Sequence, residues 1–217
     1  MPCNHKFQSY LNLERLSFKP TTLIIGTFNP EWPSENTAEW FYGRIEGSIN
    51  DHNSGNHFWA VLPRLYRMDS LKSLGKKEKW KEFCSEKKIA ITDLISCIQD
   101  ADQTDQNHKI FLKGYSDKKI AEEFQNHQLV QIVNLLQANP TIKNVYLTRG
   151  IGETFWKNKW KPIKLYCDLN NIYNRTLLTP SDYAYYQQGK YNKLHPEATL
   201  NREDFILKRW QEKWHNL

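Results

Sequence analysis

The residues best suited to do chemistry lie in one short stretch, Gly26-Thr27-Phe28-Asn29-Pro30. An apolar run rich in β-branched side chains precedes it at residues 21–25, which predicts a buried strand of a parallel sheet. Ligands bind just beyond the carboxyl ends of such strands, so Thr27 and Asn29 would offer polar groups to a cleft. Gly26 would let the backbone turn or approach a ligand closely. A plain turn between strand and loop explains the same residues equally well.

Two further polar groups stand where they could serve the same cleft. Residues 89–95 form a second apolar run, and Asp93 lies near the end of the strand that this run predicts. A helix cap or a turn acceptor is the alternative role for Asp93. Asn56 directly precedes apolar residues at helical spacing, which is typical of a helix N-cap.

The elements that position these groups follow from the rest of the sequence. Apolar runs at residues 142–148 and 175–179 predict two more strands, and helical patterns lie between the four strands. This alternation predicts a layered α/β fold with a mostly parallel sheet. The helices are expected at residues 76–88, at 117–137 behind a Ser116 cap, after Gly150, and at 203–214. Residues 1–18 are expected to form an arm or short helix, residues 96–115 a solvated loop, and residues 31–56 a long ordered loop.

Composition narrows the class of protein. The 217 residues suffice for a single domain, which we expect to span 1–217 with its core at roughly 20–190. No apolar run approaches the roughly 20 residues of a membrane helix, and no signal-peptide core is visible, which predicts a cytoplasmic protein without a membrane partner. The four cysteines are widely spaced and the acidic residues near 100–105 are scattered, so we expect no metal site. The net charge of +6 is compatible with a nucleic-acid partner.

Three motifs occur in a telling order: Gly26-Thr27-Phe28-Asn29-Pro30, Phe41-Tyr42-Gly43-Arg44 and Asn56-His57-Phe58-Trp59. Together they resemble the uracil-DNA glycosylase superfamily, particularly its hypoxanthine-DNA glycosylase-like branch. Asp93, Thr148-Arg149-Gly150 and Pro180-Ser181 fall where that family places its other cleft loops. The resemblance implies a three-layer α/β/α sandwich with a four-stranded, mainly parallel sheet.

The sequence also departs from the family pattern at three places. Residues 45–55 separate the Tyr-Gly pair from the Asn-x-Phe-Trp element, which relatives join almost directly. Asn29 comes one position later than the residue that other branches use to position water. The loop that begins at Pro180 lacks the family's small, Ser/Thr-rich residues.

The resemblance implies a monofunctional DNA glycosylase that hydrolyses the N-glycosidic bond of a deaminated base such as uracil or hypoxanthine. The base would be flipped out of the helix and attacked by an activated water, with neither a metal nor another cofactor. By resemblance Asn56 would position this water and would be the residue whose loss harms the rate most, with Asn29 and Asp51 as the other catalytic candidates. The DNA would contain a damaged base, and the enzyme would act as a monomer.

The resemblance also distributes the binding roles. Phe28 would stack on the extruded base, and the other residues expected around that base are Gly26, Thr27, Tyr42, Asp93 and Arg149. The DNA strand would contact Pro180, Ser181 and Tyr183 in the last loop, and phosphates would contact Lys157, Lys159 and Lys161. Tyr183 or Tyr185 would fill the vacated place in the base stack, unless these tyrosines belong to the core. Two other functions remain open: a catalytically silent nucleic-acid-binding relative, and a hydrolase of a small nucleoside-like compound.

Overall fold

The structure is a computed structural model that describes residues 1–44, 56–72 and 77–215. A four-stranded, wholly parallel sheet forms its centre, with the strand order β5-β2-β8-β9. Its strands are β2 (Thr22–Gly26), β5 (Ile89–Asp93), β8 (Asn144–Leu147) and β9 (Tyr173–Thr176). All residues of β2 are buried, as expected for a strand with neighbours on both edges and helices on both faces.

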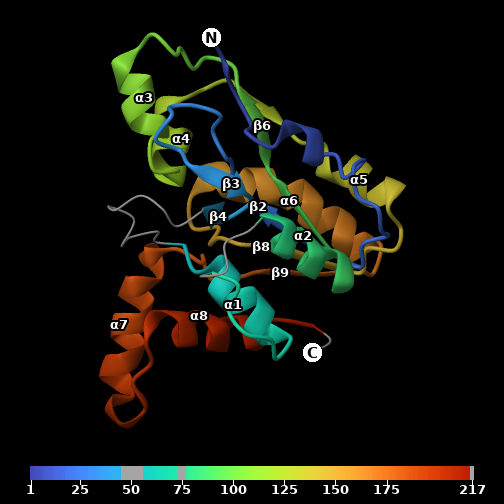
Figure 1. Cartoon of the computed structure of the whole chain (residues 1–217), viewed down its shortest axis with the longest axis vertical. Coiled ribbons are helices and arrows are strands. Elements are labelled where there is room, and N and C mark those ends of the chain that lie inside the picture. The colour runs from blue at the N-terminus through green and yellow to red at the C-terminus, as the bar shows by residue number, and fades with distance from the viewer. Residues whose placement is uncertain (45–55, 73–76, 216–217) are drawn as a thin grey trace.

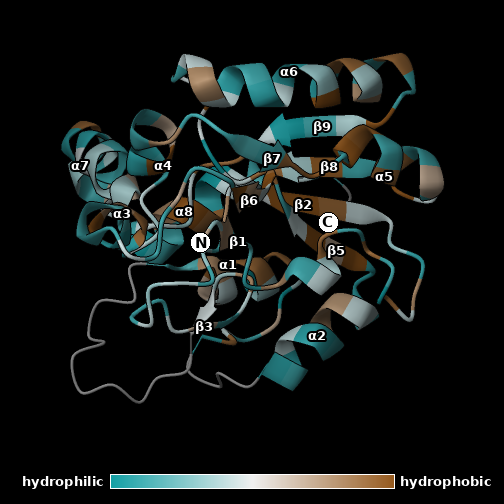
Figure 2. Cartoon of the chain, turned by 90° about the horizontal axis from the view of Figure 1, so that it is seen from above, coloured by the Kyte–Doolittle hydropathy of each residue, from teal (hydrophilic) through white to brown (hydrophobic). Residues whose placement is uncertain are grey.

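Helices cover the two faces of this sheet. Figures 1 and 2 together place α5 (Ile132–Ala138) and α6 (Thr154–Leu169) on one face. The opposite face carries α1 (Phe58–Leu65), α2 (Lys77–Glu86) and α8 (Arg202–Gln211). The predicted three-layer α/β/α sandwich with a four-stranded sheet is therefore confirmed.

Smaller elements surround this core. They are β1 (Cys3–Asn4), η1 (Gln8–Tyr10), β3 (Ala38–Trp40), β4 (Gly43–Arg44), β6 (Ile95–Ile98), α3 (Gln106–Leu112), α4 (Asp117–Glu123), β7 (His127–Leu129), η2 (Asp182–Ala184), α7 (Tyr185–Leu194) and η3 (Pro196–Ala198). Strands β1, β6 and β7 form a second, antiparallel sheet, so the N-terminal arm is part of a sheet. The expected solvated loop at residues 96–115 instead contributes β6 and α3. Helix α7 has no buried residue and projects away from the sheet (Figure 1).

The single long helix predicted over residues 117–137 is wrong. Helix α4 ends at Glu123, and β7 separates it from α5. Asp100 explains the break, because its carboxylate accepts hydrogen bonds from the backbone N–H groups of Gln125 (2.7 Å) and Asn126 (3.2 Å). A continuing helix would need those donors for its own carbonyls, so a tertiary contact overrides the helical periodicity.

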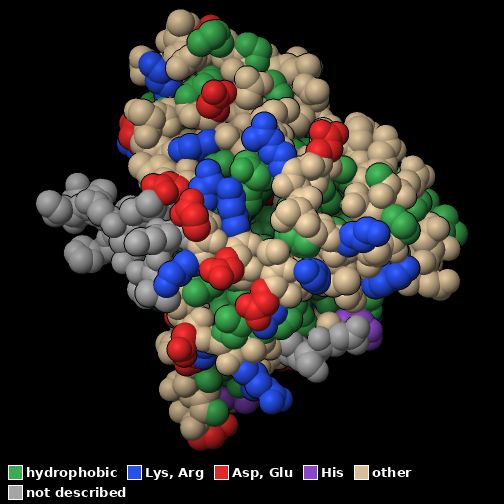
Figure 3. Space-filling view, turned by 45° about the vertical axis from the view of Figure 1, so that its right-hand side comes forward, with side chains coloured by type: hydrophobic (Ala, Val, Ile, Leu, Met, Phe, Trp, Pro, Cys, Tyr) green, Lys and Arg blue, Asp and Glu red, His purple; other side chains and the backbone are tan. Residues whose placement is uncertain are grey.

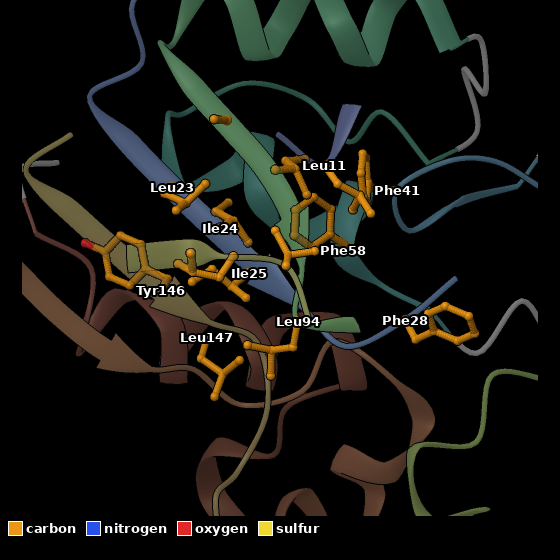
Figure 4. Packing of buried hydrophobic residues seen from close by; sticks show 14 of the residues in the cluster. Leu11, Leu23, Ile24, Ile25, Phe28, Phe41, Phe58, Leu94, Tyr146 and Leu147 are labelled. Carbon is orange, nitrogen blue, oxygen red and sulfur yellow. The ribbon is translucent and has the colours of Figure 1, made fainter. Parts of the chain in front are cut away.

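Aromatic side chains fill much of the hydrophobic core. Trp59 of α1 and Trp80 of α2 stack with ring centroids 5.4 Å apart, and both are almost fully buried. A Cβ placed on Gly43 would collide with the Trp80 ring, so only glycine allows β4 to pass this close. Figure 4 shows Leu23, Ile24 and Ile25 packed together in this core, whereas Phe28 lies apart from them, beyond the end of the strand.

Candidate active site

A cavity of about 860 Å³ opens at the carboxyl end of the parallel sheet. Residues at or just beyond the carboxyl ends of all four strands line it, as the rule for open α/β sheets predicts. Ten of the residues expected from the sequence lie in its wall: Thr27, Phe28, Asn29, Tyr42, Asn56, Asp93, Arg149, Pro180, Ser181 and Tyr183. Gly26 lies just behind the wall, because a Cβ on it would collide with the Asp93 carboxylate and the Tyr42 hydroxyl.

The Asp93 carboxylate is buried in the cavity wall, with a side chain that is 1% exposed. Its Oδ2 accepts hydrogen bonds from His5 Nε2 (2.7 Å) and from Asn29 Nδ2 (2.6 Å). The Phe7 backbone N–H donates to His5 Nδ1 (2.9 Å), so His5 Nε2 carries the proton that bonds Asp93. These contacts hold a buried carboxylate in place and turn the Asn29 amide into a fixed orientation.

His5 was not expected in the site, and it arrives through the N-terminal segment. The backbone of this segment pairs with the loop after β2: Lys6 N–H donates to the Asn29 carbonyl (2.8 Å) and Glu31 N–H donates to the Asn4 carbonyl (3.0 Å). A lone histidine in a segment without periodicity gives no signal in the sequence. Pairings with the loop after β2 and with β6, both distant in the sequence, bring His5 to Asp93.

Tyr42 forms one side wall of the cavity. Its backbone has a φ of 59°, and its ring stacks on Phe58 with centroids 4.1 Å apart. Thr148 Oγ1 donates to the Ile25 carbonyl (3.2 Å), so the Tyr42 hydroxyl donates to Thr148 Oγ1 (2.7 Å). Burial raises the pKa of Tyr42 well above its ordinary value, with Asp93 adding to the rise. Tyr42 therefore stays protonated, and Phe58 occupies one of its ring faces.

Asn56 stands at the start of α1 and pairs with Ser181 of the last loop in an isolated bridge. Its Oδ1 accepts a hydrogen bond from the Phe58 backbone N–H (2.9 Å), two residues along the chain, which is an Asx turn leading into α1. The N-cap of α1 is His57, without a side-chain cap, so the predicted N-cap lies one residue too early. The His57 backbone N–H donates to the Pro180 carbonyl (2.5 Å). The segment that leads into α1 therefore meets the last loop of the cleft at Asn56 and His57.

A second polar cluster in the cavity wall consists of Thr27, Asp117 and Arg149. Thr27 Oγ1 donates to Asp117 Oδ1 (2.5 Å), and Asp117 Oδ2 lies 2.9 Å from Arg149 Nη1 as an ion pair. The Arg149 guanidinium lies over the Trp156 ring, 4.3 Å from its centroid. Burial raises the pKa of Asp117 above its ordinary value, and Arg149 offsets part of the rise. Asp117, the first residue of α4, is expected from the sequence only as a helix-start residue, because nothing there shows that α4 borders the cleft.

The expected DNA-contacting residues separate into two groups. Tyr183 lies in the cavity wall and is 75% exposed, and the nearby Tyr185 is 59% exposed, so neither is a core tyrosine. The three lysines Lys157, Lys159 and Lys161 lie along α6 and do not line the cavity. Lys159 is half-buried with its Nζ 4.0 Å from the Phe155 ring centroid, and burial lowers its pKa. Asp51 lies outside the described residues.

None of the described helices is long and apolar enough to cross a membrane. No group of three or more His, Cys, Asp or Glu side chains in residues 1–44, 56–72 and 77–215 is arranged to hold a metal ion.

A charged network ties the Asn56 turn to α8. His57 Nδ1 lies 3.0 Å from Glu203 Oε1, and Lys72 Nζ lies 3.2 Å from the same oxygen. These two partners lower the pKa of Glu203 to about 2, with the hydrogen bond to His57 as the largest cause. A depressed carboxyl pKa stabilises the fold above the ordinary value of 4.5, and this contribution is lost as the pH falls toward 2.

Glu203→Gln should therefore lower the free energy of unfolding at pH 7 by about 1 kcal/mol, because the side chain is one-third exposed and solvent screens the interaction. The difference from the unsubstituted protein should shrink steadily between pH 4.5 and 2. Urea unfolding across this range measures it. Glu197→Gln, at an exposed position, is the control. A Glu203→Gln effect that is the same at every pH would contradict the ion-pair origin.

Comparison with known proteins gives a distant structural similarity. No protein-family model matches the sequence, and comparison with curated proteins gives no match. Among solved structures, the chain is similar to the solution structure of a candidate uracil DNA glycosylase from Methanosarcina acetivorans. The two share 13% sequence identity and align with a TM-score of 0.48, over 92% of this chain and 94% of the other. A similarity of this size assigns neither activity nor substrate to this chain.

Proposed function

We propose that the protein is a monofunctional DNA glycosylase that hydrolyses the N-glycosidic bond of a deaminated base, uracil or hypoxanthine. The observation that carries this proposal is the His5–Asp93–Asn29 hydrogen-bond chain, of which Asp93 and Asn29 lie in the wall of a cavity of about 860 Å³. This volume falls in the range of roughly 300–1,000 Å³ that is typical of pockets for small-molecule ligands. The ordered motifs around Gly26, Tyr42 and Asn56 point to the same chemistry.

Hydrolysis of this bond places distinct demands on a site. The bond between the sugar C1′ and the base nitrogen breaks, its electron pair leaves with the base, and the sugar gains positive charge. A water oxygen then bonds to C1′ and its proton ends on the departing base or in solvent. A fixed carboxylate such as Asp93 stabilises the developing positive charge, because the protein has oriented it before the reaction begins.

The hydrogen-bond directions suggest which amide holds the water. Asn29 uses its Nδ2 group on Asp93, so its Oδ1 remains as an acceptor for a water hydrogen. Asn56 already engages one of its two Oδ1 lone pairs on the Phe58 N–H, so its Nδ2 group is the part that it offers most fully, as a donor. An attacking water has to donate to an acceptor. We therefore assign water positioning to Asn29, and assign to Asn56 a hydrogen bond donated to a substrate oxygen.

The base itself would lie between the side walls. Phe28 is 3% exposed and meets His5 edge-on, with centroids 5.6 Å apart, so it would present its accessible edge or face only after a small movement. Gly26, Thr27, Tyr42, Asp93 and Arg149 complete the proposed base-binding set. Extruding a base costs a few kcal/mol, and stacking on an aromatic ring returns roughly 1–3.

The last loop is proposed to meet the DNA. Tyr183 is well placed to fill the vacated stack, because its ring is exposed beside the cavity. Pro180 and Ser181 would contact the strand that carries the damaged base. Lys157, Lys159 and Lys161 would bind phosphates farther from the cavity.

One observation favours a second candidate, a hydrolase of a small nucleoside-like compound. On the face shown in Figure 3, Lys and Arg side chains are interspersed with Asp and Glu side chains rather than gathered into one basic surface. The lysines of α6 also stand away from the cavity. A free nucleoside would need the same cavity but no phosphate contacts.

The deciding experiment offers the protein a panel of duplex and single-stranded oligonucleotides, each with one uracil, hypoxanthine, other damaged base or normal base, together with the matching free nucleosides. We expect release of a deaminated base from DNA and none from normal DNA. DNA binding should weaken steeply with salt, because neutralised phosphates release counterions. Release from nucleosides alone, with salt-insensitive binding, would establish the second candidate, and DNA binding without any release would establish a silent relative.

A further inference from the structure

The pair formed by Asp117 and Arg149 has a chemical pattern that the proposed mechanism does not use. A carboxylate that accepts and a guanidinium that donates lie 2.9 Å apart in the cavity wall. Arg149 Nη1 is buried and, although it is ion-paired with Asp117, it has no hydrogen-bond partner of good geometry within the described part of the chain. Buried donors are normally satisfied, so an unsatisfied one beside a cavity points to an acceptor on a ligand.

Asp117 retains capacity for a ligand of its own. An ionised carboxylate has about four acceptor sites, and Thr27 and Arg149 engage two of them. About a third of the Asp117 side chain is exposed, whereas Arg149 is 10% exposed. The pair therefore presents one open acceptor beside one unsatisfied donor.

We propose that Asp117 and Arg149 read the –NH–C(=O)– edge of the extruded base, an inference that rests on the proposed glycosylase function. Asp117 accepts from the ring N–H and Arg149 donates to the adjacent carbonyl. Hypoxanthine and uracil carry this edge. Adenine and cytosine present the reverse pattern, a ring-nitrogen acceptor beside an amino donor, which would set acceptor against acceptor and donor against donor. Deamination would thus convert a rejected edge into an accepted one.

A methyl group on the ring nitrogen provides the test, because it removes the N–H and leaves the carbonyl. We expect the protein to bind free hypoxanthine at least about 100-fold more tightly than 1-methylhypoxanthine, since a site that hydrogen-bonds a substrate N–H strongly rejects an analogue without it. Uracil and 3-methyluracil should behave in the same way. Binding is measured by calorimetry or ligand-observed NMR.

The variants are Asp117→Ala and the more conservative Asp117→Asn, with Glu122→Ala on the exposed side of the same helix as control. Asp117→Ala should reduce the preference for the unmethylated base to less than about tenfold, Asp117→Asn should reduce it partly, and the control should keep it. Thermal melting tests whether each variant is folded. If Asp117→Ala does not fold, the base preference of Asp117→Asn decides the test.

Three results would overturn the edge assignment: no binding of either unmethylated base at millimolar concentration, equal binding of methylated and unmethylated bases, or full preference in the Asp117 variants. Assays of base release from uracil- and hypoxanthine-containing DNA run alongside. Edge-dependent binding without base release would support the edge assignment and contradict the glycosylase function instead. Base release by the unsubstituted protein, with an unchanged preference in the Asp117 variants, would support the glycosylase function and contradict the edge assignment.

Discussion

Asn29→Ala should lower the rate of base release by about 10²–10³-fold, the range typical of losing one preorganised hydrogen-bonding group at the reacting atoms. DNA affinity should change little, because the Asn29 amide contributes mainly in the transition state. The reason is local: alanine removes the Oδ1 acceptor for water and also one of the two hydrogen bonds to Asp93 Oδ2. Single-turnover base release with saturating protein measures the effect. Asn158→Ala, at an exposed position on α6, is the matched control.

Asn56→Ala distinguishes the role that the family resemblance gives to Asn56 from the role that its hydrogen bonds give it. The resemblance makes Asn56 the most important residue, whereas the hydrogen-bond directions give it a donor role. We expect a smaller loss of rate than for Asn29→Ala, together with about 1 kcal/mol of lost stability from the missing hydrogen bond to the Phe58 N–H. A larger rate loss for Asn56→Ala would exchange the two roles. If an active protein were slowed by neither substitution, Asp51 would be the remaining candidate.

Gly43→Ala should lower the free energy of unfolding by roughly 1–3 kcal/mol, the usual cost of overpacking a core. The new methyl group would collide with the Trp80 ring, which cannot yield easily. Trp80 is 1% exposed, stacks on Trp59 and donates from Nε1 to the Leu71 carbonyl (3.1 Å). Because Gly43 follows Tyr42, the strain should also displace a cavity wall and weaken base binding. Denaturant unfolding and base titration measure the two effects.

Gly189→Ala is the matched control with an expected effect of opposite sign. Gly189 lies inside α7, and a Cβ there would meet no atom within 4 Å. Alanine in a helix interior is favoured over glycine by about 0.5–1 kcal/mol, so this substitution should leave stability unchanged or raise it. A Gly43→Ala protein as stable as the unsubstituted one would show that Trp80 has room to move.

The sequence alone suffices for the central sheet, because each strand is a short apolar run between turn residues. The runs at β2, β5 and β8 are visible in this way, and parallel pairing places their ends together. The run at residues 175–179 predicts the last strand too late: β9 is Tyr173–Thr176, since pairing with β8 selects that register. The polar residues after these strands could therefore be predicted to share one cleft.

Residues that reach the cleft through long-range contacts could not be predicted. His5 depends on the pairing of the N-terminal segment with the loop after β2, and Asp117 depends on where α4 lies. The end of α4 depends in turn on Asp100, about twenty-five residues earlier in the chain. The local sequence pattern predicts none of these contacts, because the side chains that make them are polar and are not part of a periodic apolar pattern.

The strand order β5-β2-β8-β9 also has a consequence for how the chain becomes folded. Strand β2 emerges early in synthesis, but its neighbours begin at Ile89 and Asn144, so both its edges stay unpaired while those segments are made. Such an exposed apolar strand is a place where chains pair with one another and aggregate. Pairings this far apart in sequence also form slowly. The same topology that gathers distant loops into one cavity therefore leaves the nascent protein exposed to aggregation until β8 has been added.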